Sequence, residues 1–174
     1  MLNCHDRSVR EVIPVYLGAQ RDAYAVEFNV EIFNMEKGRH QLIGEADVLL
    51  YSDPFDESPV CLSEACHSSG KVKANAFALR DLRQRGKLMV VEYKSYADWS
   101  TKMTALEQLY KLGRCLNLPA ENLVAIFGND EDDSFEVFEY DVLCRKLNAE
   151  RKYRRITRTA SGEDVSFTPE SSPA

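Results

Sequence analysis

The tripeptide Glu92-Tyr93-Lys94 follows an apolar run from Leu88 to Val91, and its residue types could do chemistry. Alternate residues of a strand share a face, so Glu92 and Lys94 are expected to point the same way. An unsatisfied charge at the end of an apolar strand is costly, because burial removes its hydration. The tripeptide therefore predicts either a plain salt bridge at a strand end or a carboxylate and an ammonium held there for a reaction.

A second acidic residue, Asp47, lies in an otherwise apolar stretch that continues into Val48 and Leu50. If the strands that contain Asp47 and Glu92 are neighbours, their carboxylates share one face at about 5 Å. Two carboxylates that close repel each other unless a proton or a cation lies between them. A hard divalent ion such as Mg²⁺, or Mn²⁺ in its place, suits a site of oxygen ligands completed by water. Such an ion acidifies water and stabilises charge on a phosphoryl oxygen, and Lys94 could orient or deprotonate the attacking water or stabilise the transition state.

The elements that must position these residues follow from the periodicity of apolar side chains. A period of two predicts strands from Tyr24 and over 41–51, and short apolar runs predict buried strands at 88–94 and 123–128. Helical spacing predicts helices over 6–22, 76–85 and 101–116, the last capped by Asp98 or Ser100. A further strand at 135–140 and a final helix over 141–155 complete the order. The expected fold is a single α/β domain with a mixed central sheet flanked by helices.

The length and composition fit one globular domain. The chain has 174 residues, of which 44% are hydrophobic and 29% charged. We expect a domain over 1–158, a loop insertion over 52–75 and a disordered tail over 159–174. The beginning of the sequence lacks the apolar region of a signal peptide and no apolar run could span a membrane, so an intracellular, cytoplasmic protein is expected. Its five cysteines, an odd number, are then expected to be thiols.

The pattern of Asp47, then Glu92-Tyr93-Lys94, then a helix with Gln108 resembles the PD-(D/E)XK superfamily of metal-dependent nucleases, which has the restriction-endonuclease-like fold. The resemblance spans about 8–128 and includes the order of elements. It implies that Asp47 and Glu92 bind the metal together with the Tyr93 backbone carbonyl, and that Lys94 is the catalytic lysine. It also offers Glu11 in the first helix and Gln108 in the later helix as accessory residues.

The sequence departs from the family pattern at several points. Ala46 stands where a proline usually precedes the Asp, and the gap from Asp47 to Glu92 is long, for which the 52–75 stretch would account. Leu112 stands four residues after Gln108, so the subgroup with a tyrosine there is not matched. The subfamily therefore stays open. A second Glu-x-Lys, Glu150-Arg151-Lys152, lies in a polar stretch and shows that the tripeptide alone is a weak signal.

Other residues have an ordinary explanation beside a functional one. Glu45 shares the face of Asp47 and is either a further site carboxylate or an exposed strand residue. Cys61, Cys66 and His67 have the wrong spacing for common zinc fingers. A basic C-terminal stretch that includes Lys152, Arg154 and Arg155 either contacts phosphates or is a solvated helix face.

We therefore expect a metal-dependent nuclease whose partner is nucleic acid, with DNA favoured over RNA. The net charge of −6 argues against a binder that works through overall positive charge, although a local basic patch is compatible with it. Two alternatives are a catalytically inactive member of the same fold that binds nucleic acid or protein, and an interaction domain of unrelated α/β fold. No membrane partner is expected, and the oligomeric state stays open.

Overall fold

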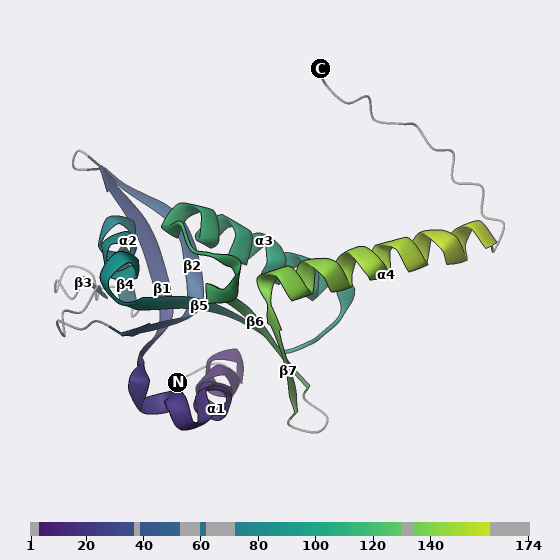
Figure 1. Cartoon of the computed structure of the whole chain (residues 1–174), viewed down its shortest axis with the longest axis horizontal. Coiled ribbons are helices and arrows are strands. Elements are labelled where there is room, and N and C mark those ends of the chain that lie inside the picture. Colours follow the sequence, from purple (N-terminus) through teal and green to yellow (C-terminus); the bar gives the residue numbers. More distant parts are fainter. Residues whose placement is uncertain (1–3, 37–38, 53–59, 62–71, 130–133, 161–174) are drawn as a thin grey trace, which may run out of the picture.

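The computed structural model describes residues 4–36, 39–52, 60–61, 72–129 and 134–160. Its strands form one seven-stranded sheet in the order β3-β4-β1-β2-β5-β6-β7 (Figure 1). The strands are β1 (Ala25–Glu36), β2 (Arg39–Ser52), β3 (Val60–Cys61), β4 (Val72–Asn75), β5 (Lys87–Lys94), β6 (Leu123–Gly128) and β7 (Phe135–Glu139). The helices are α1 (Cys4–Leu17), α2 (Ala76–Arg85), α3 (Trp99–Leu116) and α4 (Tyr140–Ala160), with 3-10 turns η1 (Gly18–Ala23) and η3 (Ala120–Asn122).

The sheet is mixed, which confirms the α/β class expected from the sequence. β2 pairs antiparallel with both β1 and β5, and β5 pairs parallel with β6. Every residue of β6 is buried, as are five of the eight residues of β5. Their short apolar runs have this pattern because both faces of the sheet are covered.

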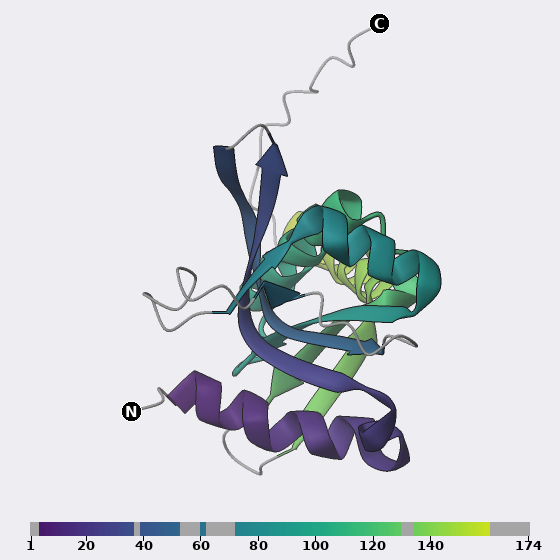
Figure 2. The ribbon, with the colours of Figure 1, turned by 90° about the vertical axis from the view of Figure 1, so that its left-hand side faces the viewer.

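Two helical layers cover the sheet (Figure 2). On one face, α1 packs Val9, Ile13 and Leu17 against the side chains of Val48 and Val91 and their neighbours. On the other face, α2, α3 and the first part of α4 pack in a larger core cluster. Because strand residues alternate between the faces, the two clusters determine the side on which each residue of β2 and β5 lies.

Side-chain caps fix where the two central helices begin. The Asn75 side chain accepts a hydrogen bond from the Phe77 N–H, and Asp98 accepts from the Thr101 N–H at 2.8 Å. Short polar side chains at this position satisfy amides that the first turn leaves without a partner. The helix predicted over 76–85 is confirmed with those bounds, and Asp98 is the cap of α3.

The structure corrects parts of the sequence analysis. The first helix begins at Cys4 and ends at Leu17, after which the chain forms a 3-10 turn where a continuous helix to 22 was predicted. The stretch 52–75 was expected to be a loop, but 60–61 and 72–75 are strands, and β4 pairs parallel with β1. Four residues are too short to give a strong periodic signal. The rest of that stretch, residues 130–133 and residues 161–174 of the tail lie outside the described residues.

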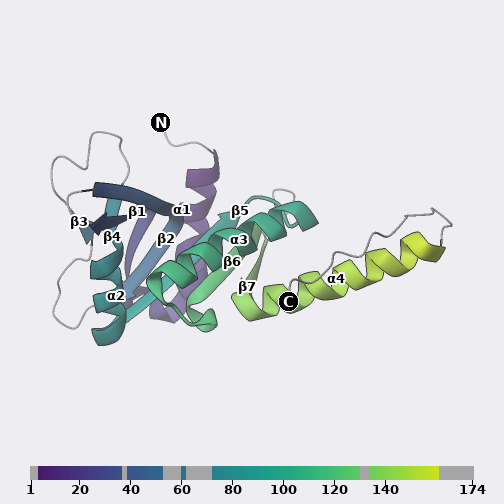
Figure 3. The ribbon, with the colours of Figure 1, turned by 90° about the horizontal axis from the view of Figure 1, so that it is seen from above.

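The final helix is longer than predicted and extends away from the sheet (Figure 3). Leu143 and Leu147 of α4 join the core, and the later turns project beyond it.

Cys115 and Cys144 are thiols, as expected, among the cysteines whose side chains are described. Within the described part of the chain, no helix is long and apolar enough to cross a membrane.

Candidate active site

The ladder between β2 and β5 stops at the pair Val48 and Val91, and Asp47 lies one residue beyond it. There the Asp47 side chain, through Oδ2, accepts the backbone N–H of Tyr93 at 2.8 Å. A carboxylate thus takes the position that a backbone carbonyl would fill if the ladder continued. The Asp47 carboxylate therefore joins β2 to β5 at the point where their backbone ladder ends.

Asp47, Glu92 and Lys94 share one face of the sheet. Leu88 and Val90, which precede Glu92 in the same alternation, pack in the core cluster of α2 and α3. In the antiparallel register Asp47 is the residue opposite Glu92, and opposite residues point to the same side. The structure thus places the carboxylates of Asp47 and Glu92 next to each other, as the sequence suggested for the case that their strands are neighbours.

Glu92 is a buried carboxylate in an unfavourable electrostatic environment. Its exposed fraction is 1%, and burial together with the nearby charge of Asp47 raises its pKa to about 8. Lys94 opposes this rise through an ion pair, with Nζ 2.5 Å from Oε1. The other oxygen, Oε2, is buried and makes no hydrogen bond to the described residues. An atom of this kind calls for a proton or a cation beside it.

The donor set fits a hard divalent ion. The Oε2 atom of Glu92 offers an oxygen without a partner among the described residues, and Asp47 offers a second carboxylate on the same face. In an extended strand the N–H and C=O of one residue point to the same neighbour, so the Tyr93 carbonyl is directed to the same gap as its N–H. Carboxylate and carbonyl oxygens with water are the ligands that Mg²⁺ prefers.

The accessory residues are placed unequally. Gln108 lies on α3, on the same side of the sheet as Glu92, and its Oε1 is buried without a hydrogen bond in the described part of the chain. Glu11 is exposed on α1, which covers the opposite face. Among the described residues no group of three Asp, Glu, His or Cys side chains could hold a metal, so Glu11 does not join the other two carboxylates. Half-buried Glu45 is two residues from Asp47 on β2, opposite Glu31 of β1.

Two further groups of residues from the sequence analysis have side chains outside the described part of the structure. The side chains of Lys152, Arg154 and Arg155 lie outside the described residues, although the backbone there belongs to α4. Cys66 and His67 of the weak zinc pattern also lie outside them.

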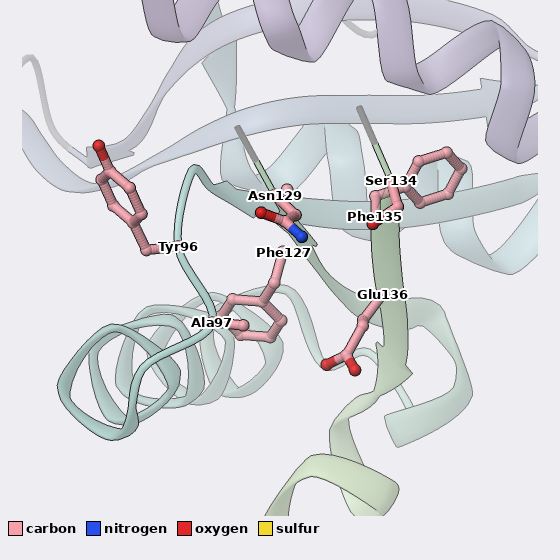
Figure 4. Close-up of a pocket in the computed structure, with 8 residues that line it drawn as sticks. Tyr96, Ala97, Phe127, Asn129, Ser134, Phe135 and Glu136 are labelled. Atoms are coloured by element: carbon pink, nitrogen blue, oxygen red, sulfur yellow. The ribbon is translucent and has the colours of Figure 1, made fainter. Parts of the chain in front are cut away.

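A pocket that the sequence analysis missed lies at the carboxyl ends of β5 and β6 (Figure 4). Its volume is about 280 Å³, and its lining comes from the loop after β5, the end of β6 and the start of β7. Tyr96 follows Lys94 by two residues, and the Phe127 backbone pairs with that of Lys94 across the parallel strands. An aromatic residue in a polar segment after the Glu-x-Lys strand was the available signal.

Comparison with solved structures finds similarity to NucC. The chain matches NucC of E. coli MS115-1 in its cAAA-bound form with 11% identity and a TM-score of 0.41, over 84% of this chain and 76% of that one. The apo form of the same protein gives 10% identity and 0.38, over 84% and 89%. The cAAA-bound NucC of P. aeruginosa ATCC27853 gives 10% and 0.40, over 84% and 77%. No protein-family model and no curated protein matches the sequence. At these TM-scores the similarity gives no residue-by-residue correspondence with NucC.

Proposed function

We propose that this protein is a metal-dependent nuclease that hydrolyses phosphodiester bonds of nucleic acid. The observation that supports it best is the pair of carboxylates, Asp47 and Glu92, on one face where β2 and β5 separate. Glu92 is buried, has a raised pKa and lies against an ammonium group. A merely structural ion pair would not need a second carboxylate beside it, because that charge raises the cost of burial.

In this proposal Asp47, Glu92 and the Tyr93 carbonyl hold Mg²⁺ or Mn²⁺. The bound ion supplies Lewis-acid chemistry, since it acidifies water and neutralises charge on a phosphate. The fold provides rigidity: the Tyr93 N–H fixes the carboxylate of Asp47, and the buried strand fixes Glu92. Rigid ligands cost less free energy to order when the ion binds.

Lys94 has two tasks in the proposed reaction. Its ammonium already touches Glu92, so it reduces the repulsion within the carboxylate pair. About a fifth of its side chain is exposed, so the same group can face a substrate phosphate and stabilise the charge that builds up there. In the hydrolysis, the oxygen of water bonds to phosphorus, one ester P–O bond breaks, and the departing oxygen takes a proton.

The proposed substrate class is DNA ahead of RNA. With a net charge of −6, the chain must approach a polyanion through a local cluster of cations. Helix α4 carries six basic residues: Arg145, Lys146, Arg151, Lys152, Arg154 and Arg155. In this proposal, Lys152, Arg154 and Arg155 contact phosphates of the substrate.

The test is a cleavage assay with purified protein. Linear, circular and single-stranded DNA and RNA are incubated in Mg²⁺, in Mn²⁺ and in EDTA. Cleavage should require the metal and should fall about 10²- to 10⁴-fold in Lys94→Ala. Lys87→Ala is the matched control, because Lys87 is an exposed lysine at the other end of the same strand. Cleavage by Lys94→Ala at the wild-type rate would contradict the assignment.

The inactive-module alternative makes a different prediction in the same assay. It expects binding of nucleic acid or protein with no cleavage of any substrate in either metal. Titration of the wild type with Mn²⁺ then separates the cases further. Binding of Mn²⁺ that is lost in Asp47→Asn would show that the carboxylate pair holds a metal without performing hydrolysis.

A further inference from the structure

One residue of β1 has a backbone that is not extended. Asn29 has a φ of 54°, in the left-handed region, although it lies inside a strand of twelve residues. Residues of a regular antiparallel strand have a φ of about −140°, so the N–Cα bond of Asn29 is turned by about half a rotation. This conformation is unfavourable for every residue with a Cβ, although less so for asparagine than for most. A strained residue inside a strand indicates that the fold needs the turn at this position.

The antiparallel strands β1 and β2 both turn over at the level of Asn29. In β1, Phe28 packs against the core cluster of α1, whereas Val30 is buried in the cluster of α2 and α3. In β2, Val48 belongs to the cluster of α1 and Ala46 to the cluster of α2 and α3. Residues two positions apart in a regular strand share a face, and these residues do not. Since Phe28 pairs with Val48 and Val30 with Ala46, the two strands reverse their faces together, and Figure 2 shows that they bend together.

The reversal decides the face to which Asp47 points. Asp47 lies across from Asn29, between the two pairs. Before the reversal Gly44 faces α3, because a Cβ added there would lie 3.1 Å from a side-chain carbon of that helix. If this alternation continued, Asp47 would point to the face that α1 covers, away from Glu92. Leu49, two residues after Asp47, is instead buried on the side of α2 and α3, so Asp47 shares that side with Glu92.

The core contacts before the reversal hold that part of the two strands in place. Val30, Ile32 and Ala46 are fully buried in the cluster of α2 and α3. If this part of the sheet turned over as a whole, these side chains would leave the cluster, and the burial of their apolar surface would be lost. Loss of the left-handed conformation at Asn29 is therefore expected to displace Asp47 and not this part of the core.

We propose that Asn29 is a positioning residue of the nuclease site: its left-handed backbone turns the two strands over, so that the carboxylate of Asp47 lies beside that of Glu92. The inference rests on the proposed nuclease function and adds to it a residue that acts through Asp47. Irregular positions in strands occur next to active sites because they redirect a side chain. From the position that the reversal gives it, Asp47 accepts the Tyr93 N–H at 2.8 Å, so this hydrogen bond reports where the carboxylate lies.

The test separates the backbone of Asn29 from its side chain. Asn29→Gly removes the side chain and adopts the left-handed conformation without strain, so it should bind Mn²⁺ as the wild type does. Asn29→Val disfavours that conformation, because valine is branched at Cβ, so Mn²⁺ binding measured by calorimetry should weaken about 10-fold. Asn29→Ala, a milder change of the same kind, should give a smaller loss in the same direction. Cleavage should follow the same order.

Asn117 provides the matched control. It is the other asparagine with a left-handed backbone in the described part of the chain, with a φ of 55°, and it is exposed at the end of α3. Asn117→Val introduces the same kind of strain away from the two carboxylates. It should lower the urea midpoint of unfolding and leave Mn²⁺ binding unchanged.

Hydrogen exchange of the Tyr93 amide in EDTA gives a readout that needs neither metal nor substrate. Relative to the buried amides of β6, which report unfolding of the whole domain, this amide should exchange about 10-fold faster in Asn29→Val and at the wild-type rate in Asn29→Gly. Asn117→Val should leave the ratio unchanged.

The outcomes distinguish this inference from the nuclease proposal. Wild-type Mn²⁺ binding and Tyr93 exchange in Asn29→Val would overturn the role of Asn29 and leave the nuclease proposal standing. Equal losses in Asn29→Gly and Asn29→Val would also overturn it, because they would assign the effect to the side chain. Tyr93 exchange in the expected order, in a protein that neither binds Mn²⁺ nor cleaves nucleic acid, would overturn the nuclease proposal and leave the placement of Asp47 by Asn29 standing.

Discussion

The Asp47 carboxylate accepts the backbone N–H of Tyr93 at the step where the ladder between β2 and β5 ends. One oxygen therefore performs a structural task, while the charge of the same group acts on Glu92 and raises its pKa. The position has both a backbone partner and an electrostatic one. Its substitution should separate these two effects, because an amide can replace the acceptor but not the charge.

Asp47→Asn should fold as well as the wild type, and at pH 8 in EDTA it should be at least as stable. The Asn oxygen can still accept from the Tyr93 N–H, and the repulsion with Glu92 is gone. Asp47→Ala leaves that N–H without its acceptor, which costs about 1–3 kcal/mol if no water replaces it. Urea unfolding of the three proteins at pH 8 measures the difference. Equal destabilisation by both variants would contradict the structural part of this account.

Glu92 should make the free energy of unfolding depend on pH. Its pKa rises from the ordinary 4.5 to about 8 in the fold, with burial as the largest cause and the charge of Asp47 next. Between these values the folded protein holds a proton that the unfolded chain has lost. This contribution to stability is complete below about pH 4.5 and is lost as the pH rises to about 8.

The slope is at most about 1.4 kcal/mol per pH unit, and Glu92→Gln should remove it. Urea midpoints of both proteins at pH 5, 6.5 and 8 in EDTA provide the comparison. Since all other groups are common to the two chains, the difference between the curves reports on Glu92. Parallel curves would show that its pKa is not raised in the fold.

A divalent metal ion should counteract this loss of stability at high pH. A proton and a metal ion compete for the same carboxylate, so the increase in melting temperature caused by Mg²⁺ should be larger at pH 8 than at pH 6. In Asp47→Asn and in Glu92→Gln, we expect Mg²⁺ to cause no such increase in melting temperature. Ca²⁺, which also prefers oxygen ligands, is a useful second ion because it reports binding in the absence of Mg²⁺. An increase that is the same at both pH values would argue against Glu92 as a ligand.

The sequence was sufficient for the parts of the fold that depend on long periodic segments. The alternation in β1 and β2 and the apolar runs of β5 and β6 correctly predicted a mixed sheet. The sequence also offered the hypothesis that Asp47 and Glu92 share one face, on the condition that their strands are neighbours, and β2 and β5 do pair. Burial of these short runs on both faces of the sheet accounts for their continuous apolar character.

Other features depend on long-range contacts and could not be predicted in this way. β4 is a strand because it pairs with β1, and its four residues show hardly any pattern of their own. Glu11 was chosen by its place in the first helix, but a helical pattern does not say which face of the sheet the helix covers. The pocket near Lys94 forms only when the ends of β5, β6 and β7 come together.

Gly86, between α2 and β5, should not tolerate a side chain. A Cβ at this position would overlap the backbone carbonyl oxygen of Ser52 at the end of β2. Because a backbone atom of a paired strand cannot move aside, Gly86→Ala should cost about 1–3 kcal/mol or more. Gly18→Ala is the control: its φ of 50° is strained for alanine, but no atom lies within 4 Å of the added group. Urea unfolding should rank Gly86→Ala as the more destabilising change.

The contact between α3 and α4 should respond unequally to the loss of its two charges. Lys102 is 7% exposed, and its Nζ lies 3.6 Å from Oε1 of Glu150, which is more exposed. Lys102→Met replaces a buried ammonium with an apolar chain of similar length, so stability should change little or increase. Glu150→Ala leaves the ammonium buried without this partner and should cost about 1–3 kcal/mol, reduced by the exposure of Glu150. Thermal unfolding of both variants and of the double variant measures these changes in stability. In the double variant, Lys102→Met should restore most of the stability that Glu150→Ala loses. Two losses of stability that simply add would show that the ion pair does not join the helices.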